Sequence, residues 1–198
     1  MALAKIIVKG RLYAIEKIFY RTKGSSGQTM VDNKNKKNIE EYAKYYLVHA
    51  GGKRYWIKQI WFPDTSYKHF PDKTNHKNEI MKEFDNIRRN DFLVNCDGST
   101  ITAIKAVDYE KDKLVTEYCE GYSRYTKHKG NGANKIIIRT LLLKWASQLK
   151  LKNYDMNKNN ILIKKDGKGK IHIKMVDFAD SYNKPISMCE SFIRSITK

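Results

Sequence analysis

Segments in which β-branched and aromatic residues alternate with polar ones dominate the N-terminal half of the chain. This pattern is typical of half-buried strands, and it predicts strands in residues 3–20, with a break near Gly10, and in residues 45–62. Gly51-Gly52 divides the second segment and suits the positive-φ positions of a two-residue hairpin turn. Residues 21–38 are rich in Gly, Ser, Asn and Lys and are predicted to form a loop.

Two segments have the spacing of helices instead. Residues 75–89 place Ile80, Phe84 and Ile87 three and four positions apart, which predicts one apolar helix face. Residues 134–151 are apolar over a wider face, and this predicts a buried helix.

The remaining pattern predicts two pairs of strands. Residues 101–109 and 113–121 form the first pair, residues 161–165 and 170–178 the second, and a turn at Asp166-Gly167 joins the second pair. Residues 122–133 are predicted as a loop or short helix.

This order places a β-rich part first and a helix-led part second. The boundary is expected near residues 117–122, with one lobe in residues 1–117 and the other in residues 118–198.

The charge is strongly basic, and two explanations of it stay open. The formal net charge is +18 and the pI is near 9.7. A balance of this kind indicates nucleic acid or an acidic protein as partner. Most of the basic residues are Lys, and Asn is also abundant, which is equally typical of the composition bias of an AT-rich genome.

Cysteine and histidine exclude some classes of protein. The three cysteines form no C-x-x-C pair, which disfavours a disulfide framework, and the five histidines have no zinc-binding spacing. No apolar run is long enough to cross a bilayer. We therefore expect a soluble, intracellular, cytoplasmic protein with no membrane partner.

Three oxygen-bearing side chains carry the candidate chemistry. Asp155 and Asn160 lie in a polar loop between the buried helix and an apolar strand, and Asp177 ends the next strand. Because antiparallel strands joined by a tight turn bring their far ends together, these side chains should lie close to one another. Carboxylate and amide oxygens in such a group suit Mg²⁺.

The same residues resemble the active site of protein kinases. Asp155-x-x-x-x-Asn160-Ile-Leu-Ile resembles the catalytic loop, and Val176-Asp177-Phe178 resembles the metal-binding D-F-G segment. The resemblance implies that Asp155 accepts the proton of the acceptor hydroxyl, with Lys158 as a further catalytic residue. It also implies that Asn160 and Asp177 hold Mg²⁺ or Mn²⁺ on the phosphates of ATP.

Upstream segments extend this resemblance to about residues 42–180. Tyr55-Trp56-Ile57-Lys58 resembles the V-A-I-K strand, which implies that Lys58 binds the ATP phosphates. Glu79 is the implied ion-pair partner of Lys58, with Glu83 one turn further as a rival.

Residues 114–121 resemble the hinge that binds adenine through its backbone, which gives Glu117 and Cys119 a role in nucleotide binding.

The sequence also departs from the kinase pattern. No G-x-G-x-x-G precedes Lys58, Ala179 stands in place of the D-F-G glycine, and Asn153-Tyr154 replaces the usual His-Arg. Only residues 180–198 follow, so the resemblance implies a reduced helical C-lobe. The expected fold is α+β and two-lobed, with a mostly antiparallel β N-lobe, as in compact atypical members of the superfamily.

These observations favour an ATP- and magnesium-dependent phosphotransferase acting on a hydroxyl, with a protein Ser or Thr as the expected acceptor. The alternative is a pseudokinase or basic scaffold that binds nucleic acid or an acidic protein. Each residue also has an ordinary structural interpretation: Lys58 as a solvated strand lysine, Asp155 as a turn residue, Asp177 as a strand-end cap.

Overall fold

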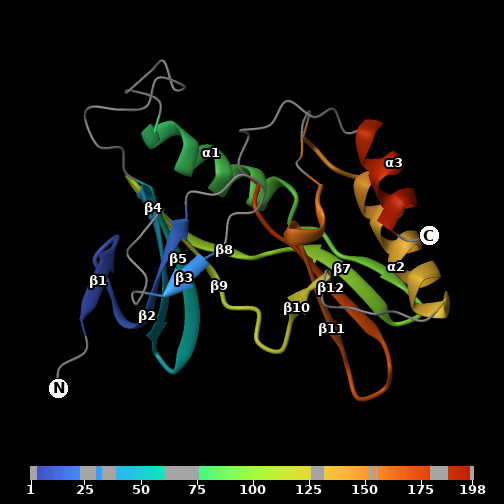
Figure 1. Ribbon diagram of the computed structural model, residues 1–198, viewed down its shortest axis with the longest axis horizontal. Coiled ribbons are helices and arrows are strands. Elements are labelled where there is room, and N and C mark those ends of the chain that lie inside the picture. Colours follow the sequence, from blue (N-terminus) through green and yellow to red (C-terminus); the bar gives the residue numbers. More distant parts are fainter. Residues whose placement is uncertain are drawn as a thin grey trace. The chain divides into compact units, whose positions relative to one another are not determined.

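The chain forms two compact units, which are described one at a time. The computed structural model describes residues 4–22, 30–32, 39–60, 76–125, 132–151, 154, 156–178 and 187–196 (Figure 1). The first unit comprises Met1–Phe84 and Ala106–Tyr118, and the second comprises Asp85–Lys105 and Cys119–Lys198.

A seven-stranded antiparallel sheet forms the body of the first unit. Its strands run in the order β1-β2-β4-β5-β9-β8, and β3 pairs with β2 outside this path. The strands are β1 (Lys5–Val8), β2 (Arg11–Thr22), β3 (Met30–Asp32), β4 (Ile39–Ala50), β5 (Lys53–Ile60), β8 (Ala106–Glu110) and β9 (Lys113–Glu117).

Alternation along β4 and β5 gives this sheet its buried face. Tyr46 lies opposite Ile57 and Val48 lies opposite Tyr55, and all four side chains are buried in one core cluster. The turn between these strands has φ values of 57° and 72° at its two glycines, so the expected positive-φ hairpin is confirmed. Because side chains alternate between faces, Lys58 lies on the face opposite the core cluster.

Helix α1 (His76–Arg89) packs on the Lys58 face of the sheet. Phe84 of the helix contacts Tyr109 of β8, with 4.6 Å between ring centroids. Leu114 of β9, the cross-strand partner of Lys58, is buried on this face. The predicted amphipathic helix is therefore confirmed.

The second unit contains a five-stranded sheet and two further helices. The strand order is β10-β11-β12-β7-β6, in which β12 and β7 run parallel and the other pairs are antiparallel. The elements are β6 (Val94–Cys96), β7 (Ser99–Ala103), β10 (Ser123–Arg124), α2 (Gly132–Ala146), the 3₁₀ helix Lys158–Asn160, β11 (Ile161–Lys165), β12 (Ile171–Met175) and α3 (Ser187–Ile196).

One face of this sheet is apolar and is covered by α2. Ile161 and Ile163 of β11 and Ile173 of β12 point to that face, and each is at most 2% exposed. Leu142 and Trp145 of α2 are fully buried, as expected for a helix that is apolar over a wide face. Helix α3 lies beside α2 (Figure 1). Among the helices in the described ranges, none is both long enough and apolar enough to cross a membrane.

Residues 101–109 are not one strand, contrary to the sequence-based expectation. β7 ends at Ala103 in the sheet of the second unit, and β8 begins at Ala106 in the sheet of the first. The Ile104 N–H donates to the carbonyl of Met175, so the chain stays bonded to β12 until it leaves the second unit. An apolar run cannot reveal such a change of sheet, because both strands bury similar residues.

The expected single boundary near residue 117 does not describe this division. The chain does pass to the second unit after Tyr118, but residues 85–105 also belong to that unit. Five elements of the described residues were not expected: β3, β6, β10, the 3₁₀ helix Lys158–Asn160 and α3. Residues 23–29 and 33–38 of the predicted loop lie outside the described part of the chain.

Candidate functional site

Lys58 forms a largely buried ion pair within the first unit. Its Nζ lies 2.8 Å from Oε2 of Glu83, and the two side chains are 18% and 6% exposed. Strand β5 carries the lysine and helix α1 carries the glutamate. A short charge-assisted contact between two largely buried groups restrains the lysine side chain. Such a lysine can present its charge to a phosphate.

The partner of Lys58 is Glu83, which corrects the expectation of Glu79. One helical turn, a rise of about 5.4 Å, separates the two glutamates along α1. Glu83 lies among the buried positions Ile80, Phe84 and Ile87 of the same helix. Spacing alone cannot decide which of two acids one turn apart meets a strand lysine, because both lie near the same helix face.

A short 3₁₀ helix fixes the position of Asn160 in the second unit. The side chain of Asn157 caps this helix by accepting the N–H of Asn159 at 2.8 Å. The N–H of Asn160 then donates to the carbonyl of Asn157 at 3.0 Å. The Asn160 side chain is buried, with 6% of the residue exposed, so this amide has a defined surrounding.

The β11–β12 pairing brings the backbone of Asn160 next to the segment that carries Asp177. The N–H of Val176 donates to the carbonyl of Asn160 at 3.0 Å, one step beyond the last paired residues of the two strands. The carbonyl of Val176 in turn accepts the hydroxyl of Tyr154 at 2.8 Å. Both backbone polar groups of the residue before Asp177 are thus hydrogen-bonded.

Phe178, the residue after Asp177, is also held in place, by packing and by a hydrogen bond. Phe178 is buried, and its ring lies 5.0 Å from that of Tyr154 and 6.1 Å from that of Trp145. The side-chain amide of Asn86 donates to the Phe178 carbonyl at 3.2 Å. Neither Tyr154 nor Asn86 was expected as a site residue from the sequence, because their roles depend on contacts with distant backbone groups.

Asp177 itself is exposed and adopts a left-handed backbone conformation, with φ of 62°. This conformation costs a residue with a side chain about 1 to 2 kcal/mol, although Asp tolerates it better than most. The residues on both sides of Asp177 are held by hydrogen bonds to Tyr154 and Asn86. Backbone strain of this kind clusters at functional sites.

Of the other predicted site residues, Lys158, Glu117 and Cys119 lie in the described part of the chain, and Asp155 does not. Asn153 and Ala179 also lie outside the described residues. Lys158 begins the 3₁₀ helix and is exposed. Glu117 ends β9 in the first unit opposite Tyr55.

Cys119 begins the next segment of the second unit. Its carbonyl accepts the N–H of Tyr122 at 3.2 Å.

The donor set near Asp177 fits a hard divalent cation. In the described portion of the chain, no three His, Cys, Asp or Glu side chains come together. Mg²⁺, however, is commonly bound through one or two protein oxygens, with waters and substrate phosphates completing its shell. The exposed carboxylate of Asp177 and the amide of Asn160 are oxygen donors of that kind. The residues present therefore fit Mg²⁺.

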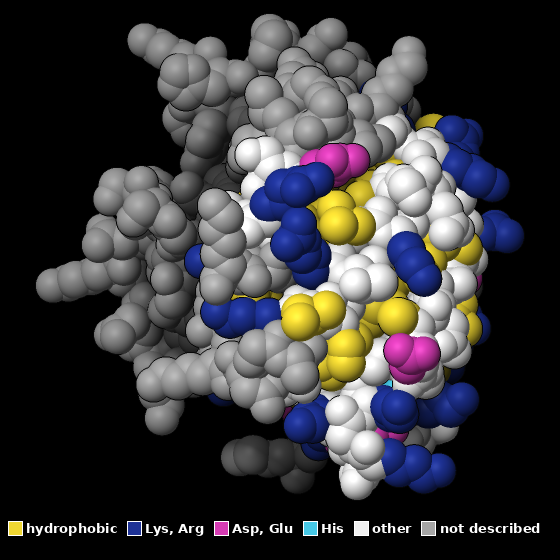
Figure 2. Space-filling model, turned by 90° about the vertical axis from the view of Figure 1, so that its right-hand side faces the viewer, with side chains coloured by type: hydrophobic (Ala, Val, Ile, Leu, Met, Phe, Trp, Pro, Cys, Tyr) yellow, Lys and Arg dark blue, Asp and Glu magenta, His cyan; other side chains and the backbone are white. Residues whose placement is uncertain are grey.

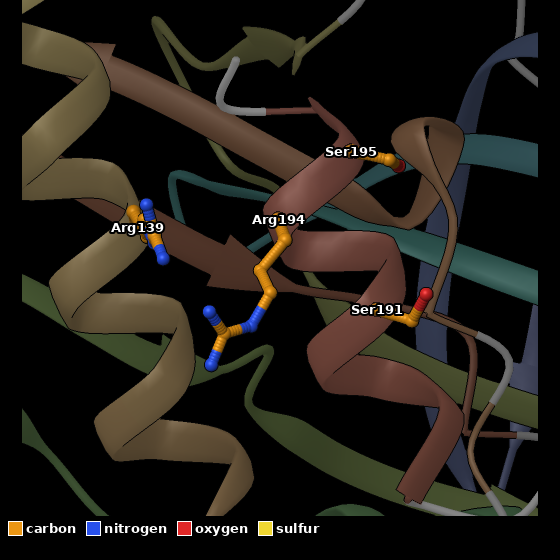
Figure 3. A pocket seen from close by; sticks show the side chains of 4 residues that line it. All are labelled: Arg139, Ser191, Arg194 and Ser195. Carbon is orange, nitrogen blue, oxygen red and sulfur yellow. The ribbon is translucent and has the colours of Figure 1, made fainter.

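A separate groove is lined by residues of α2 and α3 (Figure 3). It has a volume of about 430 Å³ and is lined by Arg139 of α2 and by Ser191, Arg194 and Ser195 of α3. Figure 3 shows the Arg194 side chain extending toward α2, whereas Ser191 and Ser195 point to the other side of α3. None of these residues belongs to the candidate site.

Comparisons with known proteins agree with the expected fold. By sequence, the chain matches no protein-family model and no curated protein. By structure, it is similar to the Rio2 kinase–ADP/Mg²⁺–phosphoaspartate complex from Chaetomium thermophilum, with a TM-score of 0.52 and 12% identity. The match covers 91% of this chain and 64% of that one, so the chain spans less than two thirds of the Rio2 chain.

The fold is therefore α+β and protein-kinase-like, with a curled antiparallel sheet in the first unit. This confirms the expected fold class. At 12% identity the likeness concerns the fold alone.

Proposed function

We propose that this protein is an ATP-dependent phosphotransferase that transfers the γ-phosphate to a hydroxyl group. The observation that carries the proposal is the buried Lys58–Glu83 ion pair on the strand and helix where the kinase resemblance requires one. Phosphoryl transfer depends mainly on positioning and charge stabilisation, and a fixed lysine supplies both to the phosphates.

The second unit would supply the metal-binding groups. Asp177 and Asn160 would hold Mg²⁺, which neutralises phosphate charge when bound. Tyr154 and Asn86 would act as positioning residues, since they bond the backbone on either side of Asp177. The structural neighbour Rio2 was solved with ADP and Mg²⁺, which supports this choice of ligands.

Asp155 would accept the proton of the attacking hydroxyl, as the kinase resemblance implies. A carboxylate in this role must be ionised and within hydrogen-bond reach of the acceptor. Lys158, three residues further, is exposed and would contact the transferred phosphate. Glu117 and Cys119 would bind the adenine ring through their backbone groups.

The acceptor would be a serine or threonine of a protein. A hydroxyl is the nucleophile that a single carboxylate base can serve. The absence of a G-x-G-x-x-G segment before Lys58 is the main feature against tight nucleotide binding, because glycines let backbone N–H groups approach phosphate closely. We therefore expect modest ATP affinity with a strong dependence on the metal.

The test is transfer of labelled γ-phosphate from ATP to the protein itself and to an added serine-rich acceptor such as dephosphorylated casein, with and without Mg²⁺. Label on either acceptor that requires Mg²⁺ supports the proposal. A stable fold that neither binds ATP nor transfers phosphate would instead support the scaffold alternative.

A further inference from the structure

The β11–β12 hairpin has a much higher density of positive charge than the chain as a whole. Residues 161–175 contain five lysines and one aspartate, whereas the whole chain of 198 residues has a net charge of +18. Four of these lysines are exposed and lie at or near the turn: Lys164, Lys165, Lys168 and Lys170. Figure 2 shows Lys and Arg side chains gathered at the lower end of the surface that it displays, where Figure 1 places the turn of the hairpin.

The one carboxylate of the hairpin is engaged by the hairpin itself. Oδ1 of Asp166 accepts the backbone N–H groups of Lys168 at 2.9 Å and Lys170 at 2.8 Å. Its Oδ2 lies 3.2 Å from Nε2 of His172. The hydrogen bond from His172, followed by the one from the Lys170 N–H, lowers the pKa of Asp166 below its ordinary value. The Asp166 carboxylate therefore stabilises the turn through hydrogen bonds to residues of the same hairpin.

Residues at the start of the neighbouring strand β7 also restrain the turn. The N–H of Ile171 donates to the buried hydroxyl of Ser99 at 3.0 Å. The stem of Lys170 packs against Gly98, where an added Cβ would come within 3.3 Å of the lysine Cε. A turn held in this way loses little conformational entropy when it binds a ligand, because its lysine-bearing backbone is already ordered.

An aromatic ring lies beside one of these lysines, Lys164, on the exposed face of the sheet. The Nζ of Lys164 lies 5.9 Å from the ring centroid of Tyr122 and 3.4 Å from the carbonyl of Glu120. Arg124 of β10 lies opposite Leu162 on this same side of β11. Cations beside an aromatic ring are the combination with which proteins bind single-stranded nucleic acids, through phosphate contacts and base stacking.

From these features we propose that the β11–β12 hairpin is a binding surface for single-stranded nucleic acid, for which an RNA strand is the probe. Lysine provides a point charge for phosphate rather than a planar fork for base edges, so the binding is expected to be independent of sequence. An acidic peptide would satisfy the charges but would make no use of the aromatic ring.

The surface is independent of the proposed phosphotransferase site. Asn160 precedes β11 and the lysine-rich turn follows it, and five residues of strand at about 3.3 Å each separate the two by roughly 16 Å. The lysines of the turn are not among the residues assigned to the phosphotransferase site, so the proposal stands whether or not the protein is a kinase.

The test is fluorescence anisotropy with a fluorescein-labelled 20-nucleotide oligouridine, titrated at several salt concentrations. The hairpin variant replaces Lys164, Lys165, Lys168 and Lys170 with Gln. The matched control replaces four exposed lysines elsewhere with Gln, namely Lys5, Lys53, Lys82 and Lys144. Both variants lose the same charge, and circular dichroism checks that both are folded.

At about 50 mM salt the hairpin variant should bind at least about tenfold more weakly than the unaltered protein, and the control within about threefold. The slope of log K against log salt should fall by up to about 3, since each phosphate contact on a single strand contributes about 0.7. Equal losses in the two variants, or no binding by the unaltered protein, would overturn the proposal. So would preferential binding of a 20-residue polyglutamate or of duplex DNA in competition.

Discussion

Lys58 and Glu83 form an ion pair in which 2.8 Å separates the ammonium nitrogen from the carboxylate oxygen. The pair joins the central strand β5 to the helix α1, and Glu83 is almost fully buried. Glu79, one turn earlier on the same helix, carries the same side chain but is only half-buried. The two glutamates therefore form a natural pair of test and control.

Replacing Glu83 should destabilise the protein, whereas replacing Glu79 should not. Glu83→Gln removes the carboxylate from a largely buried ion pair, so we expect a loss of about 3 kcal/mol in the free energy of unfolding. Glu79→Gln should change it by no more than about 0.5 kcal/mol. Urea denaturation at neutral pH measures both. Equal effects of the two substitutions would contradict the assignment of Glu83.

Asp177→Asn should remove the magnesium-dependent part of ATP binding while leaving the fold intact. Asn tolerates the left-handed backbone almost as well as Asp, so the substitution removes the charge with little added strain. A ligand that binds the native state raises the melting temperature, and we expect a shift with ATP that grows when Mg²⁺ is added. In the variant, Mg²⁺ should add nothing.

Asp97→Asn is the matched control for that experiment. Asp97 also lies in the second unit, is exposed and has a positive φ of 50°, but it is in the β6–β7 turn. Its replacement should leave the magnesium-dependent shift unchanged. If both variants keep the shift, or both lose it, Asp177 does not have the proposed metal-binding role.

Tyr154→Phe should loosen the backbone before Asp177. The substitution removes the hydroxyl that donates to the Val176 carbonyl, and we expect a loss of about 1 kcal/mol in the free energy of unfolding. If Tyr154 positions the Asp177 segment, the magnesium-dependent thermal shift should also weaken. In the double variant with Asp177→Asn, Tyr154→Phe should have no further effect on that shift. A stability loss with the full shift retained would give Tyr154 a structural role only.

Much of the first unit could be predicted from alternation and turn chemistry. Alternating apolar residues and the Gly51-Gly52 turn specify the β4–β5 hairpin, and Ile80, Phe84 and Ile87 specify the buried face of α1. These features are local, so a single sequence contains the information for them. Residue 104, where the chain passes from one sheet toward the other, has no such local signal.

The candidate site was predictable in part for the same reason. The hairpin that relates Asn160 to Asp177 depends on a short local turn, and the backbone bond between Asn160 and Val176 follows from that pairing. The choice between Glu79 and Glu83 depends on how a helix is rotated and shifted against a sheet. That arrangement is set by packing over the whole face, and two acids one turn apart fit the sequence pattern equally well.

The most direct measurement of the central claim is transfer of labelled γ-phosphate from ATP by the unaltered protein and by Asp155→Asn, each with Mg²⁺. We expect the unaltered protein to label itself or casein, and the variant to lose about 10²- to 10⁴-fold in rate, because a general base contributes an effect of that size. The variant should keep the full magnesium-dependent thermal shift with ATP. Equal labelling by the two proteins would exclude Asp155 as the base. Absence of both labelling and any thermal shift in the unaltered protein at millimolar ATP would contradict the phosphotransferase assignment itself.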